Sequence, residues 1–170
     1  VLEWARRGNA RTVLLSSSAC VYAPGSPMPV KEDAPVRPSS PYGAAKLSAE
    51  SYFRAYATCY GIDTKVVRLF NVYGPGMRKY FIYDVVRKLM REPRRLQLLG
   101  DGEQIRDYLH VSDAAEALLT VAERGRPGDV VNVASGIPVR IRELAGQIAA
   151  LMGIQGVDIE FSGTPQQGDV

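Results

Sequence analysis

Short apolar runs alternate with amphipathic segments along the chain. Runs typical of buried strands cover residues 11–15, 64–70, 96–99, 105–111, 130–134 and 157–161. Segments with helical periodicity lie between them, at 41–60, 81–91, 113–123 and 141–152, and residues 1–7 have the pattern of a helix end that Gly8 stops. Ser40 is a plausible N-cap for the longest helix, Pro41 suits its first position and Gly61 its end. Strands alternating with helices predict an α/β fold with a largely parallel sheet.

Composition and charge narrow the class of protein. The chain has 170 residues, of which 46% are hydrophobic, enough for a globular domain with a core. No apolar run approaches the roughly 20 residues that span a bilayer, and the amino terminus has no signal-peptide pattern. We therefore expect a soluble, cytoplasmic protein with no membrane contact. The net charge of +3 is mild, and the basic residues between 87 and 95 fit a solvated helix face better than a nucleic-acid surface.

Neither metal nor disulfide chemistry is predicted. The two cysteines, Cys20 and Cys59, are too few for a disulfide framework, have no metal-ligand spacing and are expected to be free thiols. The single histidine, His110, lies in an apolar strand pattern. We expect it to be a core or backbone-bonded residue without a catalytic role, and Ser112–Asp113 to cap the helix that follows.

Tyr42 and Lys46 are the first candidates for chemistry. They lie four residues apart in the first turns of the long predicted helix, so both side chains share one face. A phenol normally titrates near pH 10, but a nearby ammonium favours the phenolate, and a tyrosine so placed can act as a base near neutral pH. The pair alone also arises by chance on surface helices, so other motifs must support it.

Three further segments accompany this pair. Residues 16–22, Ser-Ser-Ser-Ala-Cys-Val-Tyr, follow a strand pattern and place hydroxyl groups at its carboxyl end, where open α/β sheets bind ligands. Residues 68–76, Arg-Leu-Phe-Asn-Val-Tyr-Gly-Pro-Gly, are again a strand followed by a turn. Residues 100–111, Gly-Asp-Gly-Glu-Gln-Ile-Arg-Asp-Tyr-Leu-His-Val, are a turn leading into a strand with an arginine near its start.

In this order and at these separations, the four segments resemble the extended short-chain dehydrogenase/reductase family, in particular its nucleotide-sugar epimerases and dehydratases. The resemblance implies that residues 1–75 are part of a Rossmann-like, doubly wound NAD-binding domain. Residues 76–170 would be mostly part of a small α/β nucleotide-sugar-binding region, intertwined with the first. No glycine-rich dinucleotide fingerprint occurs in the chain, whereas the family carries one near its amino terminus. We therefore expect a fragment that lacks the first cofactor-binding half.

The resemblance also implies roles for single residues toward NAD. Tyr42 would be the base that removes a sugar hydroxyl proton as hydride leaves for the nicotinamide, and Lys46 would bond the nicotinamide ribose and favour the phenolate. Ser18 would orient the sugar oxygen and pass its proton. Ser16 and Leu69 would complete the contacts to the cofactor. Read from the residues alone, Ser18 could instead be a strand-end hydroxyl that caps a backbone group.

Further residues would bind the nucleotide sugar. By the same resemblance, Asn71 would bond the diphosphate through its amide and Arg106 would pair with a phosphate through its planar fork. Tyr108 would share the strand face of Arg106. Asp169 would bond a ribose hydroxyl, although glutamine stands nearby where the family commonly has arginine. Arg106 as a plain surface charge and Asn71 as a turn residue are the alternatives.

The residues after Ser18 separate the reaction types of the family. Dehydratases and decarboxylases carry acidic residues there, and this chain has Ala19 and Cys20. Eliminating water needs a second acid and base, which epimerisation does not. We therefore expect a nucleotide-sugar 4-epimerase of the UDP-glucose/UDP-galactose type, a homodimer in its full-length form. A dehydratase or reductase of the family, and a non-catalytic remnant that binds a nucleotide sugar or a partner, remain open alternatives.

Overall fold

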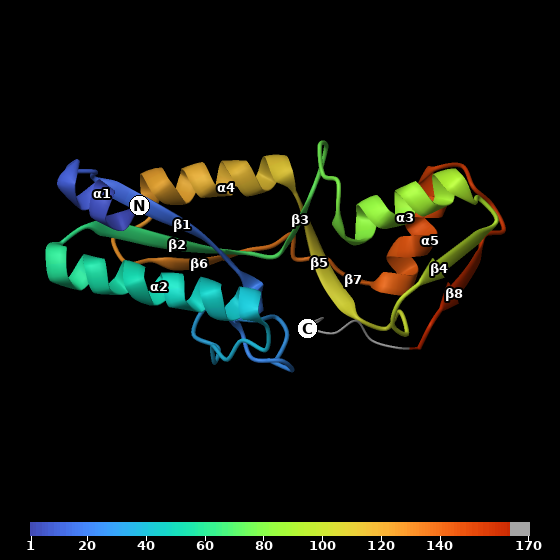
Figure 1. Ribbon diagram of the computed structural model, residues 1–170, viewed down its shortest axis with the longest axis horizontal. Coiled ribbons are helices and arrows are strands. Elements are labelled where there is room, and N and C mark those ends of the chain that lie inside the picture. The colour runs from blue at the N-terminus through green and yellow to red at the C-terminus, as the bar shows by residue number, and fades with distance from the viewer. Residues whose placement is uncertain (164–170) are drawn as a thin grey trace. The chain divides into compact units, whose positions relative to one another are not determined.

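The computed structural model describes residues 1–163, which form two compact units, each with strands and helices. Among the described residues, unit 1 comprises Val1–Val72 and Leu109–Ala134, and unit 2 comprises Tyr73–Tyr108 and residues 135–163. Figure 1 follows the chain through both units by colour. The stretch Leu109–Ala134 belongs to unit 1, and one of its strands pairs in the sheet of that unit.

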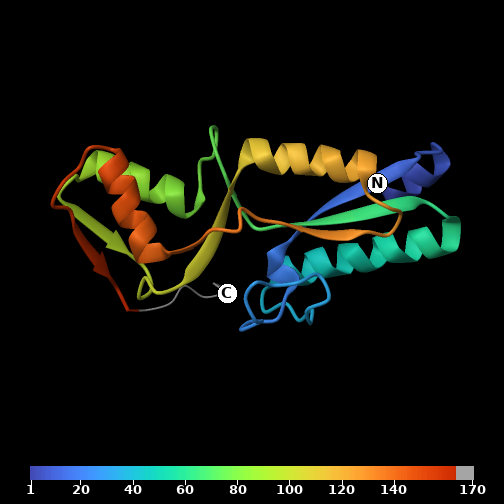
Figure 2. The same ribbon diagram turned by 180° about the vertical axis from the view of Figure 1, so that it is seen from behind.

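A parallel sheet forms the centre of unit 1. Strand β2 (Asp63–Leu69) lies between β1 (Thr12–Ser18) and β6 (Val130–Val133), and all its pairings are parallel. Helices α2 (Pro41–Tyr60) and α4 (Val111–Arg124) cover opposite faces of this sheet, as Figures 1 and 2 show. With helices on both faces, β2 is buried along most of its length, as expected for a central parallel strand.

Local sequence signals determine where α2 begins and ends. The Ser40 hydroxyl accepts a hydrogen bond from the backbone N–H of Gly43 at 3.1 Å, and Pro41 occupies the first helical position. Gly61 ends the helix in the left-handed conformation, with φ of 67°. The short helix α1 (Leu2–Arg7) ends at Gly8. These predicted boundaries are confirmed.

Helix α4 has a different cap from the predicted one. His110 is its N-cap, and the ring Nδ1 accepts a hydrogen bond from the backbone N–H of Ser112 at 3.3 Å. The prediction that Ser112–Asp113 caps the helix is therefore wrong, because the helix begins at Val111 and the imidazole takes the capping position. The prediction that His110 bonds to the backbone is confirmed.

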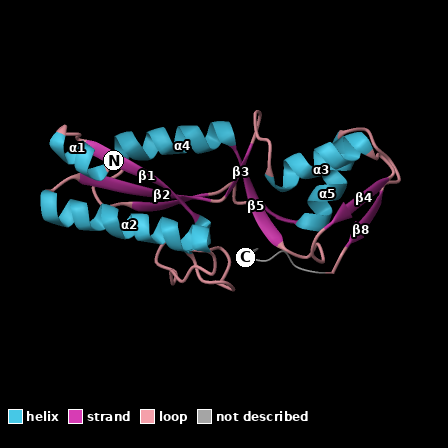
Figure 3. Ribbon diagram, in the orientation of Figure 1, coloured by secondary structure: helices cyan, strands magenta, loops and turns pink. Residues whose placement is uncertain are grey.

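Unit 2 has a smaller core between two helices and a pair of strands. Strand β4 (Arg95–Leu98) pairs in parallel with β8 (Asp158–Phe161), and helices α3 (Tyr80–Arg91) and α5 (Ile141–Leu151) pack together, as the colouring of Figure 3 makes clear. The buried side chains of this core are Val85, Leu89, Leu96, Leu98, Ala145, Ile148 and Ala149. Strand β5 (Ile105–His110) pairs antiparallel with β7 (Pro138–Arg140) in the sheet order β3-β5-β7.

The predicted α/β class is confirmed, and the predicted strands and helices are present within one or two residues of their expected ends, except that β1 ends three residues later than predicted. The sequence patterns missed two short strands, β3 (Asn71–Tyr73) and β7, and the 3-10 turn η1 (Ala19–Val21). Three residues are too few to show a strand period. Within residues 1–163, no helix has the length and apolar character needed to cross a membrane.

Candidate active site

Tyr42, Lys46 and Ser16 meet at the start of α2 in unit 1. The Lys46 ammonium donates a hydrogen bond to the backbone carbonyl of Ser16 at 2.8 Å and lies 5.6 Å from the centroid of the Tyr42 ring. Tyr42 is 55% exposed, so its phenol is open to a ligand. The four-residue spacing thus places a fixed positive charge beside an accessible phenol, the arrangement that a general base of this type needs.

Ser18 is the last residue of β1 and lies at the carboxyl edge of the sheet. Its hydroxyl oxygen accepts a hydrogen bond from the backbone N–H of Cys20 at 3.2 Å, which caps the turn η1. Ser18 therefore caps a backbone group, as the second interpretation of this residue from the sequence predicted. Because the serine oxygen is the acceptor in that bond, its own O–H remains able to donate to a ligand.

Gly43 allows α2 to approach this turn closely. A Cβ atom at Gly43 would overlap the backbone carbonyl oxygen of Cys20 and would lie 2.9 Å from Cβ of Pro38. Any side chain at this position would therefore push the first turn of α2 away from η1. The glycine beside Tyr42 thus brings the tyrosine helix against the turn that follows Ser18.

Two more predicted residues lie at the same edge of the sheet of unit 1. Leu69 is the register partner of Ser18 at the end of β2 and is half-buried. Asn71 begins β3 two residues later and is also half-buried. Ligands of parallel sheets bind at this carboxyl edge, so both residues are placed where a cofactor or substrate contact is expected.

Arg106 and Tyr108 belong to β5 in unit 2. They alternate with Asp107 along the strand, so they share the face opposite to it. The Tyr108 ring meets the Tyr73 ring edge-on at 6.3 Å between centroids. The buried Asp107 carboxylate accepts hydrogen bonds from the backbone N–H groups of Ser135 at 2.7 Å and Gly136 at 2.8 Å, which fixes the turn before β7. Asp169 lies outside the described residues.

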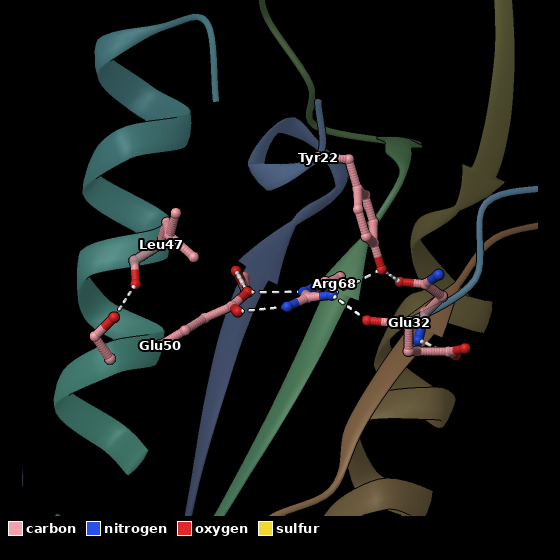
Figure 4. A network of polar contacts seen from close by, with 8 residues as sticks. Tyr22, Glu32, Leu47, Glu50 and Arg68 are labelled. Atoms are coloured by element: carbon pink, nitrogen blue, oxygen red, sulfur yellow. Dashed lines mark hydrogen bonds and ion pairs between the residues drawn. The ribbon is translucent and has the colours of Figure 1, made fainter. Parts of the chain in front are cut away.

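A buried polar network beside the candidate site was not predicted. Figure 4 shows Glu50 of α2 reaching toward Arg68 of β2, with Tyr22 on the far side of the guanidinium. Glu50 accepts hydrogen bonds from Nε and Nη2 of Arg68 at 3.0 and 2.8 Å and from the Ser17 hydroxyl at 2.6 Å. The available signal was a charged residue, Glu50 or Arg68, in a segment that packs on the core, because a buried charge requires a partner.

The charge of Arg68 is held in place by its partners. Burial works to lower the pKa of Arg68, but hydrogen bonds to Glu50 and Tyr22 outweigh burial and leave the pKa above its usual value. The side chains of Glu50 and Arg68 are each only 5% exposed. The pair is thus a buried, bidentate salt bridge between helix and sheet.

The described residues fit one end of a dinucleotide cofactor. The Lys46 ammonium has several N–H donors, and the Ser16 carbonyl accepts one of them, so the others can reach ribose hydroxyls. The open phenol of Tyr42 lies beside it. Among residues 1–163 there is no group of three or more histidine, cysteine or acidic side chains able to hold a metal ion.

The chain is similar to known proteins over most of its length. Residues 1–134 match the sequence model of the NAD dependent epimerase/dehydratase family. The UDP-glucose 4-epimerase of Mycolicibacterium smegmatis is 34% identical over 172 residues, which cover 99% of this chain and 54% of that protein. The chain spans about half the length of the curated relatives it matches.

Two solved structures have the same fold. One is a UDP-N-acetylglucosamine 4-epimerase from Methanobrevibacter ruminantium in complex with UDP-N-acetylmuramic acid, with a TM-score of 0.87 and 30% identity over 98% of this chain and 54% of that one. The other is a dTDP-glucose 4,6-dehydratase from Bacillus anthracis in complex with NAD, with a TM-score of 0.86 and 33% identity over 94% of this chain and 52% of that one.

Proposed function

The chain belongs to the NAD-dependent epimerase/dehydratase family, and from that premise we propose that the protein carrying it is a nucleotide-sugar 4-epimerase that uses NAD. UDP-glucose and UDP-galactose are the proposed substrates, because the relatives include UDP-glucose 4-epimerases over nearly the whole chain. The observation that carries the proposal is the Lys46 ammonium, which is held by the Ser16 carbonyl beside the exposed phenol of Tyr42.

In the proposed reaction, Tyr42 accepts the proton of the sugar 4-hydroxyl and later returns it. Lys46 places its ammonium beside the phenol, and the hydrogen bond to the Ser16 carbonyl holds it in that position. The O–H of Ser18 donates to the sugar oxygen and orients it for proton transfer. Tyr42, Lys46, Ser16 and Leu69 would hold the nicotinamide end of NAD, whose chemistry is to accept a hydride from the sugar carbon and give it back.

Further residues are proposed to bind the nucleotide sugar. We propose that Asn71 bonds the diphosphate, that Arg106 pairs with a phosphate and that Tyr108 contacts the nucleotide from the same strand face. Asp169 remains the candidate for a ribose hydroxyl. A homodimer in the cytoplasm, with no nucleic-acid or membrane partner, completes the proposal.

A 4,6-dehydratase is the second candidate, because a dehydratase is among the solved structures of the same fold. Elimination of water needs an additional acid and base near the sugar. Directly after Ser18 the chain has the methyl group of Ala19 and the thiol of Cys20, and neither serves well in that role. This difference favours epimerisation.

The test is turnover of UDP-glucose by the full-length protein and by its Tyr42→Phe variant. We expect the variant to lose activity by orders of magnitude while NAD stays bound. The matched control is Tyr52→Phe, because Tyr52 is on the same helix but 65% exposed and away from the Lys46 contact. Wild-type turnover in Tyr42→Phe would show that Tyr42 is not the base. A 4-keto-6-deoxy product would establish the dehydratase instead, and net consumption of reduced cofactor a reductase.

A further inference from the structure

The network around Arg68 fastens α2 to the sheet directly behind the candidate active site. Its members are Ser17, Tyr22, Glu50 and Arg68, with exposed fractions of 2%, 6%, 6% and 4%. None of them belongs to the residues proposed to touch NAD or the sugar. These residues could therefore affect the reaction only by positioning the residues next to them.

Those neighbours are the proposed catalytic residues. Glu50 follows Lys46 by one helical turn and Tyr42 by two, on the same face of α2. Ser17 lies between Ser16, whose carbonyl holds Lys46, and Ser18. A shift of Glu50 along or around the helix axis would therefore move the phenol and the ammonium together.

Glu50 bonds to both strands at one register position. Ser17 of β1 and Arg68 of β2 are paired residues in the sheet, and the Glu50 carboxylate accepts from both. Three hydrogen bonds to one carboxylate leave little freedom in the axial position or rotation of α2 at this point. Apolar packing alone would restrict that motion less, because it is not directional.

The other side of the guanidinium fixes the segment after Ser18. Nη1 of Arg68 donates to the Tyr22 hydroxyl at 2.9 Å and to the backbone carbonyl of Glu32 at 3.0 Å. The Tyr22 hydroxyl in turn donates to Oδ1 of Asn132 on β6 at 2.6 Å. One side chain thus connects the tyrosine helix with the loop that leads away from the Ser18 turn (Figure 4).

We propose that Glu50 and Arg68 are positioning residues for the reaction: their salt bridge sets where Tyr42 and Lys46 lie relative to Ser18. The inference rests on the proposed function. A purely structural role would not need the charges, because well-packed apolar residues usually replace a buried ion pair without loss of stability. Stability and positioning can therefore be separated by experiment.

The experiment replaces the pair by apolar residues in the full-length protein, as Glu50→Met with Arg68→Met. We expect near-normal thermal stability, a kcat for UDP-glucose epimerisation at least about tenfold lower, and a KM within about threefold of wild type, because small misplacements of reacting groups slow the chemical step. The matched control is Lys65→Met, which breaks a buried ion pair with Asp63 on the same strand, beside α4 rather than α2.

The control is expected to lose stability and keep kcat within about twofold, since no reacting group depends on it. A double variant that keeps wild-type kcat would overturn the inference, as would a Lys65→Met variant whose kcat falls equally far. If the double variant does not fold, Ser17→Ala decides: a kcat at least about threefold lower supports positioning, and an unchanged kcat overturns it. Tyr42→Phe separates the two proposals, because an active Tyr42→Phe enzyme would count against the proposed base and reaction, whereas a double variant with wild-type kcat would count against positioning alone.

Discussion

Removing one partner of the buried salt bridge should unfold unit 1 far more easily than removing both. In Glu50→Gln the side chain keeps its size, but Arg68, whose side chain is 5% exposed, loses its counter-charge and one of its two hydrogen bonds to residue 50, because an amide has a single acceptor oxygen. Breaking a buried pair in this way costs about 3–5 kcal/mol. At about 2–4 °C per kcal/mol for a chain of this size, the melting temperature should fall by roughly 6–20 °C.

Hydrogen exchange can locate this loss within the molecule. Peptides from β2 in unit 1 should exchange about a hundredfold faster or more in Glu50→Gln, since each 1.4 kcal/mol changes an equilibrium about tenfold. Peptides from α5 in unit 2 provide the internal reference and should change little. In the double methionine variant the protection of β2 should largely return, because no charge is left buried without a partner.

Two results would refute this reasoning. One is a Glu50→Gln protein in which β2 exchanges within about threefold of wild type, since the stranded charge of Arg68 would then cost less than about 1 kcal/mol. The other is an equal loss of protection in α5, because the pair belongs to unit 1 and α5 belongs to unit 2.

Three further predictions concern single residues. Gly43→Ala should destabilise by about 1–3 kcal/mol in thermal unfolding and lower kcat, because the new Cβ would overlap the turn after β1. Gly102→Ala should cost a similar amount, about 1–3 kcal/mol in urea unfolding, because Gly102 has φ of +81° and a Cβ there would lie 2.6 Å from the Phe161 ring. The carboxyl of Glu3 should titrate by NMR with a pKa of about 2, because the side chain of Arg6 donates hydrogen bonds to it. The lowered pKa of Glu3 contributes to stability above the pKa of the unfolded chain, near 4.5, and this contribution, which salt screens, is lost as the pH falls toward 2. Arg6→Gln should raise the pKa of Glu3.

The sequence predicted those parts of the fold whose signals are local. Helix α2 was predicted nearly to the residue because Ser40, Pro41 and Gly61 each have a direct effect on the backbone at that position. Strand β7 was missed because Pro138–Arg140 is short and has no apolar run, and its pairing with β5 joins residues more than thirty positions apart. His110 was correctly expected to bond the backbone, but the cap itself depends on the φ/ψ angles at the start of α4.

The candidate site also has a part that the sequence predicted and a part that it did not. The proximity of Tyr42 and Lys46 follows from helical spacing alone, and the structure adds the Ser16 carbonyl that anchors the ammonium. The salt bridge of Glu50 with Arg68 joins a helix to a strand, so no period in the sequence indicates it. Both residues carry charge within segments that pack on the core, and a buried charge requires a partner. A charged residue in a segment that packs on the core was therefore the available signal.

The order in which the chain visits its two units limits how the protein can be divided. It leaves unit 1 after Val72, returns at Leu109 and leaves again after Ala134. A gene cut after residue 72 would yield a product without α4 and β6, which would strip one face of the sheet of its helix and leave β2 at an edge. Exchanging unit 2 between relatives would therefore require two segments to be replaced together, residues 73–108 and the segment that begins at Ser135.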